Sequence, residues 1–182
     1  MENLSERADQ WLEQTFPGAS TTIFRDLAMN LRKILGESPL DPQDRLMNVV
    51  AVAKAVEMES LRTWAEAQLA EAGVATELIQ EARQTAGMMG MLNTYYKFKT
   101  YLAPEAKDLY QRAGLRMQAL MKPVSGKEKF EMMSLSVSVV NGCPSCVASH
   151  ERALVQLGVD PEKIHDLARL AAVIKGLSSF QV

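Results

Sequence analysis

The chain has 182 residues, of which 47% are hydrophobic and 23% are charged. This is the composition of an ordinary globular protein, and it excludes a disordered chain, a collagen and a disulfide-dense mini-protein. The net charge is −2, from 20 basic and 22 acidic side chains, so the chain as a whole lacks the positive charge of a nucleic-acid-binding protein.

The N-terminal stretch, Met1 to Glu6, is acidic and polar, without the basic and apolar regions of a secretory signal peptide. The sequence also has no run of about 20 apolar residues that would span a bilayer. We therefore expect a cytoplasmic protein whose thiols are kept reduced.

Residue types that favour helices dominate the chain, only 6% of residues are aromatic, and alternating strand patterns are scarce. These features predict an all-α fold. Proline and glycine divide the chain into expected helices at about residues 4–15, 21–35, 42–58, 60–72, 76–86, 88–102, 104–121, 127–141, 144–157 and 161–175. The pairs Asp41-Pro42 and Asp160-Pro161 each place an acidic N-cap before a proline at the first helical position.

One segment, residues 134–140, alternates serine with Leu and Val as a strand would. We expect a helix there, because small serine side chains suit close helix packing and no hairpin signal surrounds the segment. A strand remains the alternative.

The turn signals repeat along the chain. With Pro39 placed on Pro123, residues 39–74 follow residues 123–159 at a period of about 84–85 residues. We expect one helical domain over residues 1–182, built from a degenerate repeat at about 39–122 and an active repeat at about 123–182. A chance similarity is the alternative. The first repeat then has Met58, Leu61 and Ala65 at the positions of Cys143, Cys146 and His150.

The two cysteines of the chain, Cys143 and Cys146, are three residues apart. Gly142 ends one expected helix and Pro144 begins the next, which puts Cys143 at the N-cap and Cys146 in the first turn. Free N–H groups and the positive end of the helix dipole favour a thiolate there. Such a Cys-x-x-Cys pair typically has one thiol pKa lowered to about 3.5–7.5, and its spacing permits a reversible disulfide.

Two further titratable residues belong to this constellation. His150 follows Cys146 by four residues and Cys143 by seven, so all three share one helix face, where an imidazole can take up or pass on a thiol proton. Glu131 lies twelve residues before Cys143 among apolar neighbours. Burial there would raise its pKa to a range suited to proton transfer, but on this signal alone a solvated glutamate on the helix face is the favoured interpretation.

Two other interpretations of the cysteines are open. They could be an inert buried pair, or half of a zinc site with His150 as the third ligand and Glu131 or His165 as the fourth. Structural zinc sites prefer more thiolates than the two present, and no βαβ pattern indicates a thioredoxin fold. A redox dithiol is therefore the favoured interpretation.

The stretch from Phe130-Glu131-Met132 to Asn141-Gly142-Cys143-Pro144-Ser145-Cys146-Val147-Ala148-Ser149-His150-Glu151 resembles the AhpD alkylhydroperoxidase family, of the carboxymuconolactone decarboxylase superfamily. The family pattern is Glu, eleven residues, Cys-x-x-Cys, three residues and His, and all four elements are present. The similarity covers most of residues 39–176, including 89–96 and 114–117.

The resemblance implies an all-α homotrimer that reduces hydroperoxides with its own thiols and no bound cofactor. It also implies reduction of a partner peroxiredoxin, AhpC, with electrons from the dihydrolipoamide of an acyltransferase subunit and from lipoamide dehydrogenase. The Met- and Tyr-rich residues 88–101 are a candidate for part of the trimer interface.

The resemblance further assigns roles. Cys146 would be the peroxide-reactive thiol that becomes a sulfenic acid, and Cys143 the resolving thiol and proton donor. Glu131 and His150 would form the proton relay. Ser145 stands where many members have a histidine, so a second imidazole near the thiols is missing. Two alternative functions are a carboxymuconolactone decarboxylase-like lyase, which needs no Cys-x-x-Cys, and a non-enzymatic zinc-binding or interaction protein.

Overall fold

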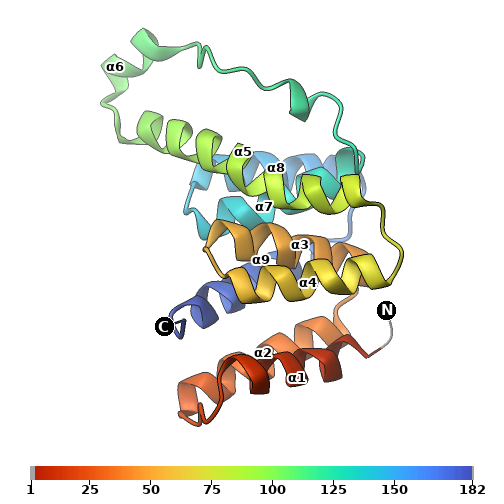
Figure 1. The fold of residues 1–182 in the computed structure, drawn as a ribbon. Helices are drawn as coiled ribbons and strands as arrows, with labels where there is room; N and C mark the ends of the chain where they lie inside the picture. Colours follow the sequence, from red (N-terminus) through yellow and green to blue (C-terminus); the bar gives the residue numbers. More distant parts are fainter. Residues whose placement is uncertain (1–2, 182) are drawn as a thin grey trace.

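The structure, a computed structural model, describes residues 3–181 and is helical, with no strand among these residues (Figure 1). The all-α prediction is confirmed. The α-helices are α1 (Leu4–Thr15), α2 (Thr22–Glu37), α3 (Pro42–Ala55), α4 (Glu59–Glu71), α5 (Thr76–Tyr101), α6 (Pro104–Lys107), α7 (Lys127–Val140), α8 (Pro144–Gln156) and α9 (Pro161–Ser178). Two 3₁₀ turns, η1 (Asp108–Tyr110) and η2 (Gln118–Leu120), lie between α6 and α7. Within the described residues, none of the helices is long and apolar enough to cross a membrane.

Helix α7 is the centre of the fold, because it packs against α3, α5, α8 and α9. Residues 130–138 are all buried, so this part of α7 is covered on every side, while its first turn is largely exposed. The pair α1–α2 lies at one end of the molecule and is attached through the packing of α2 on α9 (Figure 1). Both aspartate caps form as predicted, with Asp41 accepting from the N–H of Gln43 and Asp160 from that of Glu162.

The alternating serines of α7 point to different neighbours. Ser136 donates to Asn48 of α3 at 2.9 Å, while Ser138 accepts from Asn93 of α5 at 3.0 Å. A helix that is buried on every side has no polar face, so the alternation of serine with Leu and Val in this segment does not indicate a strand. The helix interpretation is confirmed and the strand alternative is wrong.

Two expected helix boundaries differ from the structure. Residues 76–86 and 88–102 form one continuous helix, α5, because Gly87 sits in open space and a mid-helix glycine costs only about 1 kcal/mol. Residues 104–121 are not one helix but α6, η1, a stretch without regular secondary structure and η2. Leu109 and Met121 are exposed there, and a helix that buries no apolar face is only marginally stable.

The expected two-repeat organisation remains a prediction. The pair α3–α4 occurs in the first half where α7–α8 occurs in the second, and in both cases the two helices pack together. Met58 is the N-cap of α4 as Cys143 is the N-cap of α8, and both are fully buried. The two equivalent N-cap positions therefore both hold a buried sulfur-containing side chain, but only Cys143 carries a thiol.

Candidate active site

The site is built on the turn between α7 and α8. After Asn141, Gly142 adopts a left-handed φ of 64°, and the N–H of Cys143 returns to the carbonyl of Ser138 at 3.2 Å. Cys143 is then the N-cap of α8 and Pro144 its first residue. An apolar cluster beside this turn packs α8 against α7 and α9, and consists of Leu40, Met132, Leu135, Leu154, Val159 and Leu167.

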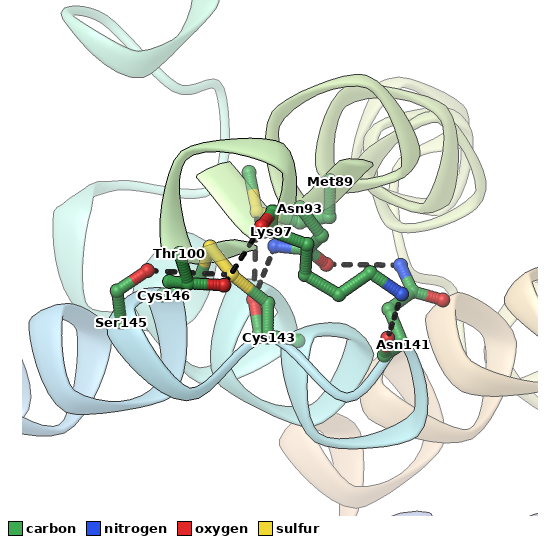
Figure 2. Close-up of a disulfide and its surroundings, with 9 residues drawn as sticks. Met89, Asn93, Lys97, Thr100, Asn141, Cys143, Ser145 and Cys146 are labelled. Carbon is green, nitrogen blue, oxygen red and sulfur yellow. Dashed lines mark hydrogen bonds between the residues drawn. A yellow bond between two sulfur atoms is a disulfide. The ribbon is translucent and has the colours of Figure 1, made fainter. Parts of the chain in front are cut away.

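A disulfide joins Cys143 to Cys146, with their Cα atoms 5.3 Å apart (Figure 2). The two cysteines differ in exposure: Cys143 is 0% exposed and Cys146 is 7% exposed. The hydroxyl of Ser145 lies 3.7 Å from Cys143 Sγ, to which it can donate. Only Cys146 lines the adjoining pocket.

That pocket, of about 350 Å³, lies between α5, α8 and the segment around η2. Its apolar walls are Leu92, Tyr96, Met117 and Leu120. Its polar side consists of Asn93, Ser145, Ser149 and His150, which surround Cys146. The pocket therefore offers one sulfur, one imidazole and an apolar surface to a small molecule.

A chain of charged groups stands behind the imidazole. Nδ1 of His150 lies 2.5 Å from Oε2 of Glu131, and Nζ of Lys127 lies 2.6 Å from Oε1 of the same carboxylate. The Glu131 side chain is only 8% exposed, whereas that of Lys127 is 54% exposed. The chain thus runs from solvent, through a buried carboxylate, to the ring that lines the pocket.

The pKa of Glu131 is lowered, which is opposite to the direction expected from the sequence. Burial works to raise it, but hydrogen bonds from His150 and Lys127 together outweigh burial. Glu131 is therefore an ionised carboxylate at neutral pH and accepts a hydrogen bond from Nδ1–H of His150. Nε2 is then the ring nitrogen that can take up or release a proton. The sequence interpretation missed Lys127, although its spacing four residues before Glu131 is the usual signal of a helical ion pair.

A second set of polar contacts anchors the α7–α8 turn to α5. Asn141 donates to the side-chain oxygen of Asn93 at 2.9 Å, and Nζ of Lys97 donates to the Asn141 carbonyl at 3.0 Å (Figure 2). Asn93 also donates to Ser138. These contacts fix the start of α8 and hence the disulfide. They join residues that are between 44 and 48 positions apart in the sequence, so no local sequence pattern predicts them.

The structure does not bring His165 to this site. It is exposed on α9 and neither lines the pocket nor bonds to Glu131. Within residues 3–181, no group of three His, Cys, Asp or Glu side chains is arranged to hold a metal ion.

Comparison with known proteins agrees with the resemblance noted from the motif. The profile of the carboxymuconolactone decarboxylase family matches residues 104–181. The chain is 39% identical over 150 residues to the alkyl hydroperoxide reductase AhpD of Anaeromyxobacter dehalogenans (strain 2CP-C), covering 82% of this chain and 80% of the relative.

Two further relatives carry the same name. Identity to AhpD of Streptomyces avermitilis is 38% over 157 residues, which covers 85% of this chain and 86% of the relative. Identity to AhpD of Mycolicibacterium paratuberculosis is 34% over 154 residues, with 85% of both chains covered.

Proposed function

The chain belongs to the AhpD family of alkyl hydroperoxide reductases, within the carboxymuconolactone decarboxylase superfamily, and we propose that it reduces hydroperoxides with the dithiol of Cys143 and Cys146. One observation carries this proposal: Cys146 faces a pocket beside an imidazole held by a buried, ionised carboxylate. A thiol, an imidazole and a cavity side by side support this proposal, because the reaction needs a nucleophile, a proton carrier and a space for substrate.

In the oxidising half of the cycle, His150 takes the proton of the Cys146 thiol. The thiolate attacks the terminal oxygen of the hydroperoxide, the O–O bond breaks, and Cys146 becomes a sulfenic acid. The leaving alkoxide takes the proton from His150 and departs as the alcohol. Glu131 stabilises the imidazolium that exists between the two transfers.

The Cys143 thiol then attacks the sulfenic sulfur and expels water, which produces the Cys143–Cys146 disulfide. Cys143 is suited to this step, because it is buried against Cys146 and out of the pocket. A dithiol donor restores both thiols by exchange, and the family relationship favours dihydrolipoamide held on an acyltransferase subunit and recharged by lipoamide dehydrogenase.

The substrate fits the walls of the pocket. Leu92, Met117 and Leu120 offer apolar contact to the carbon chain of an alkyl hydroperoxide, and His150 lies on the polar side where the O–O group would react. Reduction of the oxidised peroxiredoxin AhpC by the same dithiol is part of the proposal. We also propose a homotrimer that works in the cytoplasm, where a reducing environment keeps the thiols available.

A coupled assay tests this function. NADH, lipoamide dehydrogenase, a lipoylated carrier domain and the protein should together consume cumene hydroperoxide, and NADH oxidation should increase further when AhpC is added. The matched control is Cys143→Ser/Cys146→Ser, which has no dithiol and whose helical content is checked by circular dichroism. A rate no higher than that of the double variant, with either acceptor, would contradict the proposal.

A further inference from the structure

The chain between α5 and α7 concentrates positive charge in a protein that is acidic overall. Residues 97–129 hold eight basic and three acidic side chains, a net charge of +5. The rest of the chain holds 12 basic and 19 acidic side chains, a net charge of −7. The segment that leaves α5 loops away from the helical body and returns across it to α7 (Figure 1). We call residues 102–126 the arm.

Most of the cations in residues 97–129 form no ion pair with the described residues, so their charge is not neutralised locally. On the helical body, Arg62, Arg83 and Lys129 all form ion pairs with carboxylates. Five cations of the segment have no carboxylate within 4.0 Å among residues 3–106 and 108–181, namely Lys97, Lys99, Arg112, Arg116 and Lys122. Unpaired cations leave an uncompensated positive field at this end of the molecule.

The arm is also a wall of the Cys146 pocket. Met117 and Leu120 line that pocket, and Arg116 and Lys122 are exposed beside them in sequence. Arg112 lies against α5, where its carbonyl accepts from the hydroxyl of Tyr95 at 3.4 Å. A partner that inserts a group toward Cys146 therefore meets the exposed cations of the arm.

We propose that the arm cations Arg112, Arg116 and Lys122 form the docking surface for an acidic protein that delivers its dithiol to Cys146. This inference rests on the proposed function, because only a thiol donor needs to reach the disulfide. The partner is a protein and not a nucleic acid, since a nucleic acid carries no dithiol. Opposite charge steers such a partner to the pocket and raises the encounter rate.

The exchange is balanced without any other reactant. A thiolate of the donor attacks Sγ of Cys146, and Cys143 leaves as a thiolate. The second donor thiol then attacks the mixed disulfide and releases Cys146. Two electrons and two protons pass to the protein, and the donor becomes a cyclic disulfide.

The test compares one dithiol in two forms. Free dihydrolipoamide is uncharged, whereas a lipoylated domain of a bacterial acyltransferase with an acidic face around its lipoyl-lysine presents the same dithiol on a charged protein. Reduction of the Cys143–Cys146 disulfide is followed by stopped-flow thiol detection for the wild type and for Arg112→Glu/Arg116→Glu/Lys122→Glu. We expect kcat/KM for the carrier to fall by about 10-fold or more, and that for free dihydrolipoamide to change less than about twofold.

The matched control makes the same charge change at the other end of the molecule. Arg25, Lys33 and Lys175 are exposed and without a carboxylate partner within the described part of the chain, and their triple change to Glu should leave both donors within about twofold of the wild type. In the wild type, kcat/KM for the carrier should fall as ionic strength rises, because salt screens exposed charges, while that for free dihydrolipoamide should not.

Three outcomes would overturn the docking surface. The first is an equal fall in kcat/KM for both donors in the arm variant. The second is a fall in kcat/KM for the carrier in the control variant as large as in the arm variant, and the third is a wild-type kcat/KM for the carrier that does not depend on ionic strength. Failure of both donors to reduce the wild-type disulfide is a different result. It would contradict the proposed function, and the docking surface with it.

Discussion

Replacing Glu131 with glutamine tests the relay most directly. The amide keeps the size of a side chain that is 8% exposed, so packing around α7 is preserved. It removes the charge that His150 contacts at 2.5 Å and that Lys127 contacts at 2.6 Å. The imidazolium formed when Cys146 loses its proton then has no buried carboxylate beside it.

The expected fall in the rate of Cys146 oxidation follows from the hydrogen bond that Glu131→Gln weakens. A hydrogen bond to a charged group contributes about 1.5–3 kcal/mol, which corresponds to roughly 10- to 150-fold in rate. The cost in folding stability should be smaller, about 1 kcal/mol, because Lys127 is half exposed and water can solvate it once its partner is neutral. For a chain of this size that corresponds to a fall in Tm of about 2–4 °C.

Single-turnover oxidation of Cys146 by cumene hydroperoxide, quenched and followed by mass spectrometry, measures the rate. Calorimetry measures the Tm. Glu128→Gln is the matched control, since Glu128 is exposed on the same helix and belongs to no ion pair with the relay. A Glu131→Gln rate within threefold of the wild type, with Tm preserved, would refute the relay.

Three further predictions concern the thiols, the pH dependence and the assembly. Cys143→Ser should leave a sulfenic acid at Cys146 that a dimedone probe labels after one equivalent of peroxide, and Cys146→Ser should show no label; the opposite pattern would exchange their roles. Lys127→Met removes a hydrogen bond that lowers the pKa of Glu131, so that pKa should rise and the acid limb of the pH–rate profile should move to higher pH. A carboxyl group whose pKa is lowered by folding stabilises the fold at pH values above that pKa. The stability that this ion pair contributes is therefore lost as pH falls through the Glu131 pKa. Lys129→Met, on the same helix, is the control. Sedimentation should show a homotrimer, and a monomer at micromolar concentration would contradict it.

Local sequence signals predicted the parts of the site that depend on local geometry. The glycine, proline and cysteine spacing predicted Cys143 at an N-cap with Cys146 and His150 on the following turns, and α8 has this arrangement. The apolar neighbours of Glu131 raised the possibility that it is buried, but the sequence alone favoured a solvated side chain, and the structure buries it. The direction of its pKa did not follow from the sequence either, because that depends on which charges neighbouring helices bring to it.

The pocket and the arm could not be predicted for a related reason. Met117 and Leu120 lie far from Cys146 in sequence, on a segment whose helix-favouring composition predicted a helix over 104–121. Composition reports propensity, but the apolar contacts of this segment come from Leu115, Met117 and Leu120 near its end, while Leu109 and Met121 are exposed. The return of the arm across α5 therefore depends on tertiary contacts that local periodicity does not encode.

The unequal burial of the two cysteines explains how one site can serve both halves of the proposed cycle. Peroxide and donor must each reach a sulfur, and Cys146 is the one that lines the pocket. In the proposed cycle, attack on Cys146 makes Cys143 the leaving group, and Cys143 is the N-cap of α8, a position where the helix dipole favours a thiolate. A better-stabilised thiolate leaves faster in disulfide exchange. In this proposal the burial of Cys143 keeps it from peroxide and directs the incoming electrons through Cys146, so the positions of the two residues on one helical turn would account for both directions of the reaction.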